Sequence, residues 1–395
     1  MGSHSASPVD NNSRVQDGVF QTGNILALSI AHFIHDVYSS FLAPLLPLLI
    51  EKLSMSLTQA GFLSTVMQIP ALLNPYIGVM ADRISVRYFV ILAPAMTAVP
   101  MSLIGVAPSY GVLLILLFTA GISVSAFHVP APVMVADFSA ARKGRGMSFF
   151  MTGGELARTV GPLVAVAAVS LLGLQGFYPV MIFGLLSSVW LFFKFRRVPV
   201  KPVGSNRKLS LRDTWRSLRH VLLPLTAILV ARGFMHAAMT AFLPTFIKME
   251  TGNLWLAGMA LTLFEAAGVA GVLTAGSTSD WFGRRKTLLV SLLGAPLFLF
   301  LFTLTGGWLR FIALLVVGFT LLSTTPVMLA LVQENAGPSP AAANGLFMMV
   351  SFMARSAVVV VVGFIADRIG LTAAYLISAG MGLIGIPFVL LLPKK

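Results

Sequence analysis

The sequence has no cysteine, and only 10% of its 395 residues are charged. The absence of cysteine excludes disulfides, thiolate metal sites and thiol redox relays. The sequence also lacks a Gly-x-Ser-x-Gly elbow, a His-Glu-x-x-His motif and a Walker loop, which mark several hydrolases and ATP-driven proteins. We therefore expect neither an enzyme nor a cofactor, and an energy source other than ATP.

Apolar residues are abundant. Hydrophobic side chains make up 57% of the chain and the mean hydropathy is +0.90, more than a soluble core of this length can bury. They form segments of roughly 20 or more residues, the length of a membrane-spanning helix. Twelve such segments occur, at residues 24–50, 57–81, 88–106, 111–137, 146–170, 176–195, 220–247, 254–279, 287–306, 309–333, 342–366 and 371–392.

The predicted fold is an all-α membrane protein, with twelve transmembrane helices in two pseudo-symmetric six-helix bundles. Residues 1–22 are polar and rich in small side chains, and we expect a disordered N-terminus that is partly an expression tag. The first bundle is predicted over residues 23–195 and the second over 220–395. Residues 196–219 are hydrophilic and basic, which predicts a linker or, equally, a short amphipathic surface helix.

Acidic residues are scarce, 13 against 27 lysines and arginines, and the net charge is +14. Most of the basic residues fall in loops on one side of the predicted topology. By the positive-inside rule these loops and both termini are cytoplasmic, in the inner (cytoplasmic) membrane of the cell. A nucleic-acid partner would require a soluble basic domain interleaved with aromatics, which is absent. We expect a monomer whose partners are membrane lipid, protons and a small, anionic solute.

One charged motif occurs twice, about half a chain apart, at residues 78–87 and 276–286. Such internal repeats are typical of transporters built from two related bundles. The motif predicts gating ion pairs that form and break as the cytoplasmic side closes and opens. The gating candidates are Asp82, Arg83, Arg87, Asp280, Arg284 and Arg285. A looser copy ends in Asp367-Arg368 on the outer side, where it either serves the opposite gate or ends a helix.

Charged side chains inside the predicted spans cost about 3 kcal/mol each on insertion scales, so they should face a partner or a water-filled cavity. The charged and histidine residues in mid-span positions are Asp36, Glu155, Arg158, Arg232, Glu265, Arg355, His32, His35, His128 and His236. This set predicts a central polar cavity between the bundles. Phe127 is among the aromatic residues that we expect in its apolar wall.

In the first span, His32 and Asp36 share a helical face and His35 lies beside them. Asp36 is the first candidate proton carrier, because burial and a nearby imidazole can move a carboxyl's proton affinity towards neutrality. The alternative is a permanent hydrogen bond that fixes this span. A divalent-metal site of His32, His35, Asp36 and His236 is a third interpretation. Three arginines in the same cavity argue against it, since they repel cations.

In the fifth span, Glu155 and Arg158 are three residues apart and can form an ion pair. The pair either stabilises both charges or acts as a latch, in which protonation of Glu155 frees Arg158 for an anion. Together with Arg158, the residues Arg232, His236 and Arg355 are predicted to bind the substrate. His128 and Phe127 are predicted to line the same site. Glu265 is either a further proton-coupling residue or the partner of Arg355.

The twelve spans and the doubled loop motif resemble the major facilitator superfamily. The residues of the first, fourth and fifth spans resemble its fosmidomycin-resistance exporters, through Ala31-His32-Phe33-Ile34-His35-Asp36, Phe127-His128 and Thr152-Gly153-Gly154-Glu155. The resemblance implies a proton-coupled exporter that works by alternating access on a small anionic or amphiphilic drug or metabolite. The alternatives are an uptake symporter for an organic anion and a divalent-metal exporter.

Overall fold

The computed structural model describes residues 19–74, 77, 87–140, 142–198, 211–335 and 340–393. The predicted gating residues Asp82 and Arg83 lie outside these ranges, as do most of the predicted disordered N-terminus and residues 199–210 of the predicted linker. Helix α11 already begins at Leu211, so the described end of that linker is continuous with the seventh span.

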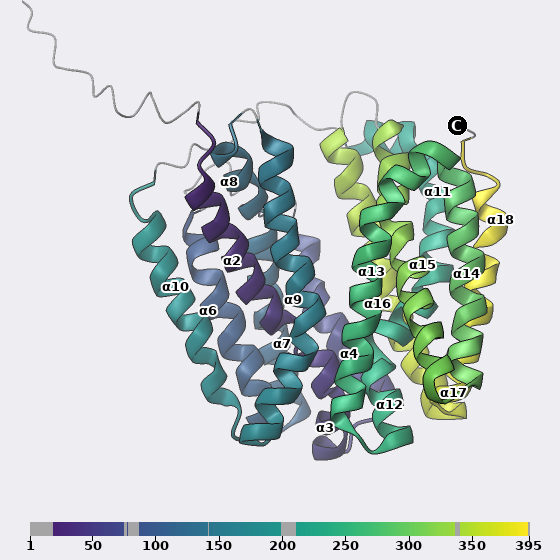
Figure 1. Cartoon of the computed structure of the whole chain (residues 1–395), viewed down its shortest axis with the longest axis horizontal. Helices are drawn as coiled ribbons and strands as arrows, with labels where there is room; N and C mark the ends of the chain where they lie inside the picture. Colours follow the sequence, from purple (N-terminus) through teal and green to yellow (C-terminus); the bar gives the residue numbers. More distant parts are fainter. Residues whose placement is uncertain are drawn as a thin grey trace, which may run out of the picture.

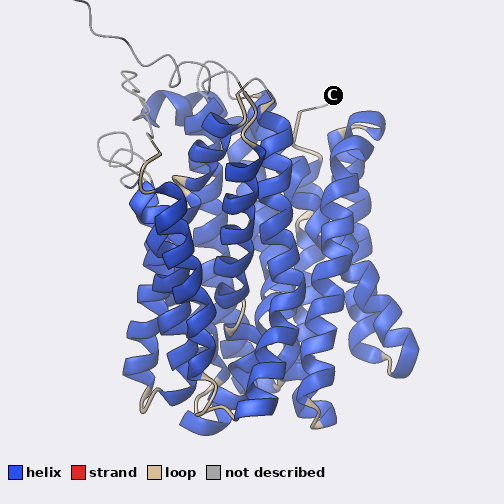
Figure 2. Ribbon diagram, turned by 60° about the vertical axis from the view of Figure 1, so that its left-hand side comes forward, coloured by secondary structure: helices blue, strands red, loops and turns tan. Residues whose placement is uncertain are grey.

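The described residues form helices and no strand (Figure 2). The first half of the chain contains α2 (Thr22–Ser39), α3 (Leu42–Leu53), α4 (Leu57–Gln68), η1 (Ile69–Leu73), α6 (Arg87–Leu103), η2 (Ile104–Val106), α7 (Tyr110–His128), α8 (Ala131–Phe138), α9 (Lys143–Leu172), η3 (Tyr178–Val180) and α10 (Met181–Phe195). The second half contains α11 (Leu211–Ala237), the π-helix η4 (Ala238–Phe242), α12 (Leu243–Thr251), α13 (Leu254–Phe282), α14 (Arg284–Leu304), α15 (Gly307–Glu334), α16 (Pro340–Ile369), α17 (Leu371–Ile384) and α18 (Ile386–Val389).

Among these described residues, eleven helical stretches are long and apolar enough to cross a membrane. The shorter apolar helix Leu57–Leu73 stands where the second span is predicted. With it, the helices follow the order of the twelve predicted spans. The prediction of an all-α membrane fold is confirmed.

Two spans that we predicted as single helices are broken at matching positions in the two halves. The first span divides between α2 and α3 before Leu42, and the seventh passes through the π-helix η4 into α12 before Leu243. A proline follows each break, at Pro44 and Pro244, and a proline cannot donate the hydrogen bond that a continuous helix requires. In the seventh span the hydroxyl of Tyr375 donates to the carbonyl of Ala238 (2.7 Å), a group in the π-helix.

The helices of the two halves stand in two groups that approach each other most closely at one end (Figure 1). We call the end where α2 begins and α18 ends the terminal end, and the end where α3 and α16 finish the far end. At the far end, one continuous hydrophobic cluster joins the halves through α3, α4, α12 and α16, including Leu45, Phe242 and Val362. Each half has a separate cluster elsewhere.

Small residues allow the backbones of α4 and α16 to approach. A Cβ added to Gly61 would lie 2.7 Å from the carbonyl oxygen of Val359, and one added to Gly363 would lie 2.4 Å from that of Leu57. The hydroxyl of Thr65 also donates to the carbonyl of Ser356 (2.7 Å). Any larger residue at these glycines would push the two halves apart.

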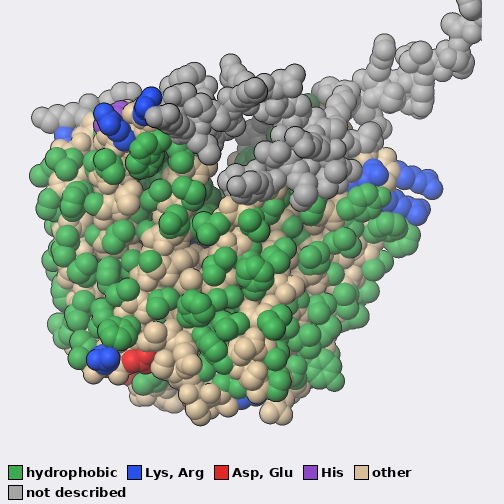
Figure 3. All heavy atoms as spheres, turned by 180° about the vertical axis from the view of Figure 1, so that it is seen from behind, with side chains coloured by type: hydrophobic (Ala, Val, Ile, Leu, Met, Phe, Trp, Pro, Cys, Tyr) green, Lys and Arg blue, Asp and Glu red, His purple; other side chains and the backbone are tan. Residues whose placement is uncertain are grey.

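The face of the molecule drawn in Figure 3 carries a broad apolar belt. Large hydrophobic side chains on it are exposed, for example Leu171, Phe193 and Val290. The visible lysine and arginine side chains lie near the upper and lower margins of this view rather than across the belt. Such a belt is the surface that lipid covers in a membrane protein.

Candidate functional site

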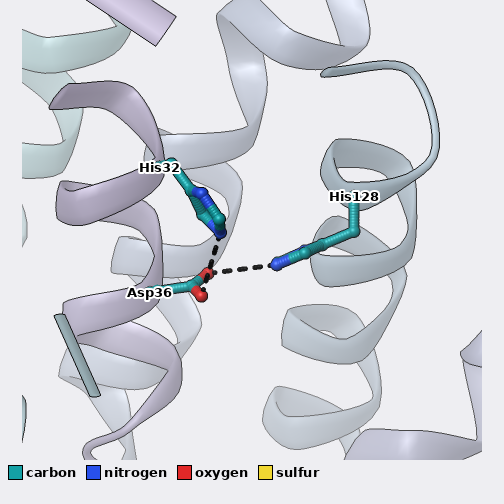
Figure 4. Close-up of side chains that lie close together, drawn as sticks. All are labelled: His32, Asp36 and His128. Atoms are coloured by element: carbon teal, nitrogen blue, oxygen red, sulfur yellow. Dashed lines mark ion pairs between the residues drawn. The ribbon is translucent and has the colours of Figure 1, made fainter. Parts of the chain in front are cut away.

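Three imidazoles surround the carboxylate of Asp36 in the middle of the first half. His32 Nε2 lies 3.2 Å from Oδ2, His35 Nδ1 lies 2.8 Å from Oδ1, and His128 Nε2 lies 3.5 Å from Oδ1. His32 and Asp36 are one turn apart on α2, and His128 reaches the carboxylate from the end of α7 (Figure 4). The predicted pairing of His32 with Asp36 is present. His128, predicted to contact substrate, also lies beside Asp36.

Backbone carbonyls fix the orientation of two of these rings. His32 Nδ1 lies 2.8 Å from the carbonyl oxygen of Phe150, and His128 Nδ1 lies 3.0 Å from that of Val124. A carbonyl only accepts, so the Nδ1 of each ring carries a hydrogen and donates it. The Nε2 of each neutral ring therefore presents a lone pair towards Asp36.

Aromatic side chains stack on two of the three imidazoles, those of His32 and His35. His32 stacks on Phe150 with centroids 4.1 Å apart, and His35 stacks on Phe127 with centroids 4.6 Å apart. Phe127 is fully buried, so in this state it supports His35 and is not accessible as the substrate contact that we predicted. His35 Nε2 is buried without a hydrogen-bond partner among the described residues.

The predicted pair of the fifth span forms on α9, where Arg158 Nη2 donates to Glu155 Oε1. Arg158 is enclosed by protein, yet 51% of its side-chain surface stays accessible, and His128 stays 38% accessible. A side chain that is both enclosed and accessible lines an internal space. Glu265 on α13 interacts electrostatically with Arg158 and has no hydrogen bond or ion pair among the described residues.

His236 on α11 lies within electrostatic range of three arginines. The charges of Arg158, Arg232 and Arg355 all act on this ring. Arg232 is buried, and within the described residues its Nη2 donates to the carbonyl of Leu321 (3.2 Å) and, weakly, to the Thr325 hydroxyl (3.4 Å). The Nε atoms of Arg232 and Arg355 are buried without partners in the described part of the chain. Arg355 lies over the ring of Phe352, and no ion pair joins it to Glu265.

The described gating candidates pair within their own half. Arg284 Nη2 lies 2.6 Å from Asp280 Oδ1 and 3.0 Å from Glu334 Oε1, which ties together the terminal ends of α13, α14 and α15. Arg285 donates to the carbonyls of Val389 and Leu390. In the first half, Arg87 donates to the carbonyl of Val198 (3.0 Å).

Sequence reasoning left the function of Asp367 open between a gate and a helix end. The structure shows that its carboxylate accepts hydrogen bonds from the other half of the chain, at the first residues of α4. Sequence reasoning also missed the contact of His128 with Asp36, which joins residues on different helices. The metal-type cluster that the structure assembles contains His32, Asp36 and His128, whereas His236 belongs to the arginine group.

Comparison with known proteins agrees with this architecture. The sequence matches the profile of the Major Facilitator Superfamily over residues 28–359 and again over residues 250–395. It is 25% identical to the fosmidomycin resistance protein of Escherichia coli over 374 residues, 92% of this chain and 91% of that protein. It is 25% identical to the multidrug resistance protein MdtG of Salmonella arizonae over 292 residues, 70% of this chain and 71% of that protein.

The fold is shared with a solved structure of a bacterial homologue of the human lysosomal transporter Spinster, in an inward-facing and unoccupied conformation. The TM-score is 0.76 at 16% identity, covering 94% of this chain and 95% of that chain. The predicted resemblance to the fosmidomycin-resistance exporters is confirmed, and the protein is a multi-pass membrane transporter rather than an enzyme. The chain belongs to the major facilitator superfamily.

Proposed function

We propose that this protein is a proton-coupled antiporter that exports a small anionic or amphiphilic compound by alternating access. The observation that carries this proposal is that three arginines, Arg158, Arg232 and Arg355, lie within electrostatic range of His236. Of these three arginines, only Arg158 forms an ion pair with a carboxylate among the described residues. An unpaired guanidinium is expensive inside a membrane unless an anion or water joins it. A carboxylate, phosphonate or phosphate group would supply the missing partner through the forked donors of arginine.

The pair on α9 would link protonation to anion binding. With Glu155 and Glu265 ionised, their charges hold Arg158. Protonation of these acids removes that attraction, so Arg158 becomes free to bind an anion. Release of the protons on the opposite side returns Arg158 to Glu155 and expels the anion. By itself this pair would carry proton and anion in the same direction, as in the uptake symporter. Export in exchange for protons therefore requires a second coupling residue that takes up a proton after the anion has left.

Asp36 is the second proposed coupling residue. Its carboxylate is enclosed by three imidazoles and lies near the space that Arg158 and His128 line. A proton bound to Asp36 in one state and released in the other would couple the first half of the chain to the transport cycle.

We further propose that the terminal end faces the cytoplasm, as the basic loops indicate. The far-end contacts between the halves then make this an inward-facing state. Residues 23–195 and 220–395 would move as two bodies, joined by residues 196–219, in a monomer of the inner membrane. The gating residues at the terminal end, Asp280 and Arg284 among them, pair within one half here. In the outward-facing state they would exchange these partners for the other half.

The test is transport by liposomes that contain the purified protein and a pH-sensitive dye. Fosmidomycin, the compound in the name of the E. coli relative, is the first solute to try, followed by other small organic anions. With the protein present, an outward solute gradient should drive proton movement in the opposite direction. Glu265→Gln and Arg158→Gln should each reduce this proton movement at least tenfold without changing the elution volume of the purified protein.

Glu250→Gln is the matched control. This acid pairs with Arg310 at the far end, outside the proposed site. Its coupling should equal that of the unmodified protein. Proton movement in the same direction as the solute would replace the antiporter proposal with the uptake symporter. Unchanged coupling in both Glu265→Gln and Arg158→Gln would remove these residues from the mechanism.

A further inference from the structure

We propose that His32, Asp36 and His128 form a binding site for a divalent transition-metal ion such as Zn²⁺. The donor atoms of the three side chains all lie within 4.8 Å of one another. Two imidazole nitrogens with one carboxylate oxygen are a common ligand set for zinc, with a fourth position open to water or another ligand.

The distances in the cluster fit a bridging metal better than direct hydrogen bonds. A charge-assisted hydrogen bond between imidazolium and carboxylate is about 2.7–2.9 Å long. His32 Nε2 and His128 Nε2 lie 3.2 and 3.5 Å from the carboxylate oxygens of Asp36. Two ligands at about 2.0–2.1 Å from a tetrahedral zinc ion are separated by about 3.3 Å. The observed separations are close to that value.

The hydrogen bonds around the cluster leave the metal-binding atoms free. His32 and His128 each donate Nδ1–H to a backbone carbonyl, of Phe150 and of Val124. In the neutral rings, both Nε2 lone pairs then point at a carboxylate, and two acceptors repel unless a cation lies between them. Metal-ligating histidines characteristically donate their second nitrogen in this way, which fixes the ring and strengthens the ligand.

Asp36 is oriented by the third imidazole. His35 Nδ1 lies 2.8 Å from Asp36 Oδ1 and can donate to it. Ligating carboxylates usually accept such a hydrogen bond from a neighbour. The partial exposure of the His128 side chain provides an entry path, while His32 and Asp36 are buried.

The arginines do not oppose a cation at this place as the sequence suggested. The charge of Arg158 acts on His128 and Asp36, but its ion pair with Glu155 balances most of that charge. The unpaired arginines Arg232 and Arg355 act on His236 and belong to the second half of the chain. The described acids and bases therefore leave the carboxylate of Asp36 as the dominant charge of the cluster.

The inference can be tested by metal binding alone, without transport, so its outcome is independent of the proposed function. The purified protein is freed of metals by a chelator, and any polyhistidine tag is removed beforehand. Zn²⁺ is then titrated by calorimetry, and Co²⁺ by its visible absorption, which intensifies in a four-coordinate site. We expect one saturable site per chain. His32→Gln and His128→Gln should each weaken binding at least tenfold.

His236→Gln is the matched control, because it removes a histidine of a membrane-spanning helix that lies outside the cluster. Its metal affinity should equal that of the unmodified protein, and size-exclusion chromatography should show all three variants folded. Zn²⁺ binding that survives both His32→Gln and His128→Gln would overturn the inference. The absence of saturable Zn²⁺ binding up to about 1 mM in the unmodified protein would also overturn the inference. The cluster would then bind protons and no metal ion.

Discussion

Replacing Asp367 with asparagine should loosen the far end of the protein and favour the state that is open there. Asp367, near the end of α16, accepts from the backbone N–H groups of Leu57 (2.7 Å) and Thr58 (2.8 Å) and from the Thr58 hydroxyl (2.5 Å). These donors belong to the start of α4, in the other half of the chain. A carboxylate from one half thus caps a helix N-terminus of the other, where an anion is favoured.

The magnitude follows from what asparagine retains. Asparagine keeps the shape and one acceptor oxygen, but it loses the negative charge and the second acceptor. Removal of an N-cap acceptor costs about 0.5–2 kcal/mol and loss of an anion at a helix N-terminus costs about 0.3–1 kcal/mol. Because Asp367 is exposed to water, we take about 1 kcal/mol as the net loss, equivalent to a roughly fivefold change in the ratio of closed to open states.

The chain is well suited to the measurement because it has no cysteine. Cysteines introduced at Leu171 and Trp308, both highly exposed near the far end in opposite halves, provide sites for spin labels. Pulsed electron paramagnetic resonance then gives the populations of short and long distances between the two spin labels. Asp367→Asn should raise the ratio of long to short separations about fivefold.

The matched control is Glu250→Gln, which removes one charge from an ion pair with Arg310 inside a single half at the same end. It should leave the far-end distance distribution unchanged. If Asp367→Asn also leaves the distribution unchanged, or if Glu250→Gln shifts it equally, the cap across the halves does not contribute to closure.

Three other substitutions follow from the packing. Gly61→Leu should prevent the far end from closing, because its Cβ alone would meet the carbonyl of Val359 at 2.7 Å. Crosslinking or the same label pair would detect the change, and an unchanged population of the closed state would contradict the prediction. Tyr375→Phe should destabilise the protein by about 1–3 kcal/mol, because it leaves the buried Ala238 carbonyl without its donor; an unchanged thermal unfolding midpoint in detergent would contradict it. Arg232→Met should keep or raise thermal stability while abolishing solute transport, since it removes a buried charge that has no carboxylate partner among the described residues; a large loss of stability would indicate a structural role instead.

The sequence established the membrane class and the order of the spans because hydropathy and length act locally along the chain. It also predicted the pairs within one helix, His32 with Asp36 and Glu155 with Arg158, since helical spacing alone brings such residues together. The first span contains Phe41-Leu42-Ala43-Pro44 and the seventh contains Phe242-Leu243-Pro244, two similar segments at related positions. They did not reveal that the first span divides there and that the seventh contains a π-helix, because such breaks depend on packing and on partners such as Tyr375.

The tertiary structure decided every contact that joins distant helices. His128 reaches Asp36 from α7, Phe127 is buried behind His35, and Asp367 caps α4 across the two halves. Each of these contacts depends on how helices lie side by side, and periodicity along one helix contains no information on its neighbour. The sequence determined which charges enter the membrane, and the fold alone divided them into a histidine–carboxylate cluster in one half and an arginine group centred on the other.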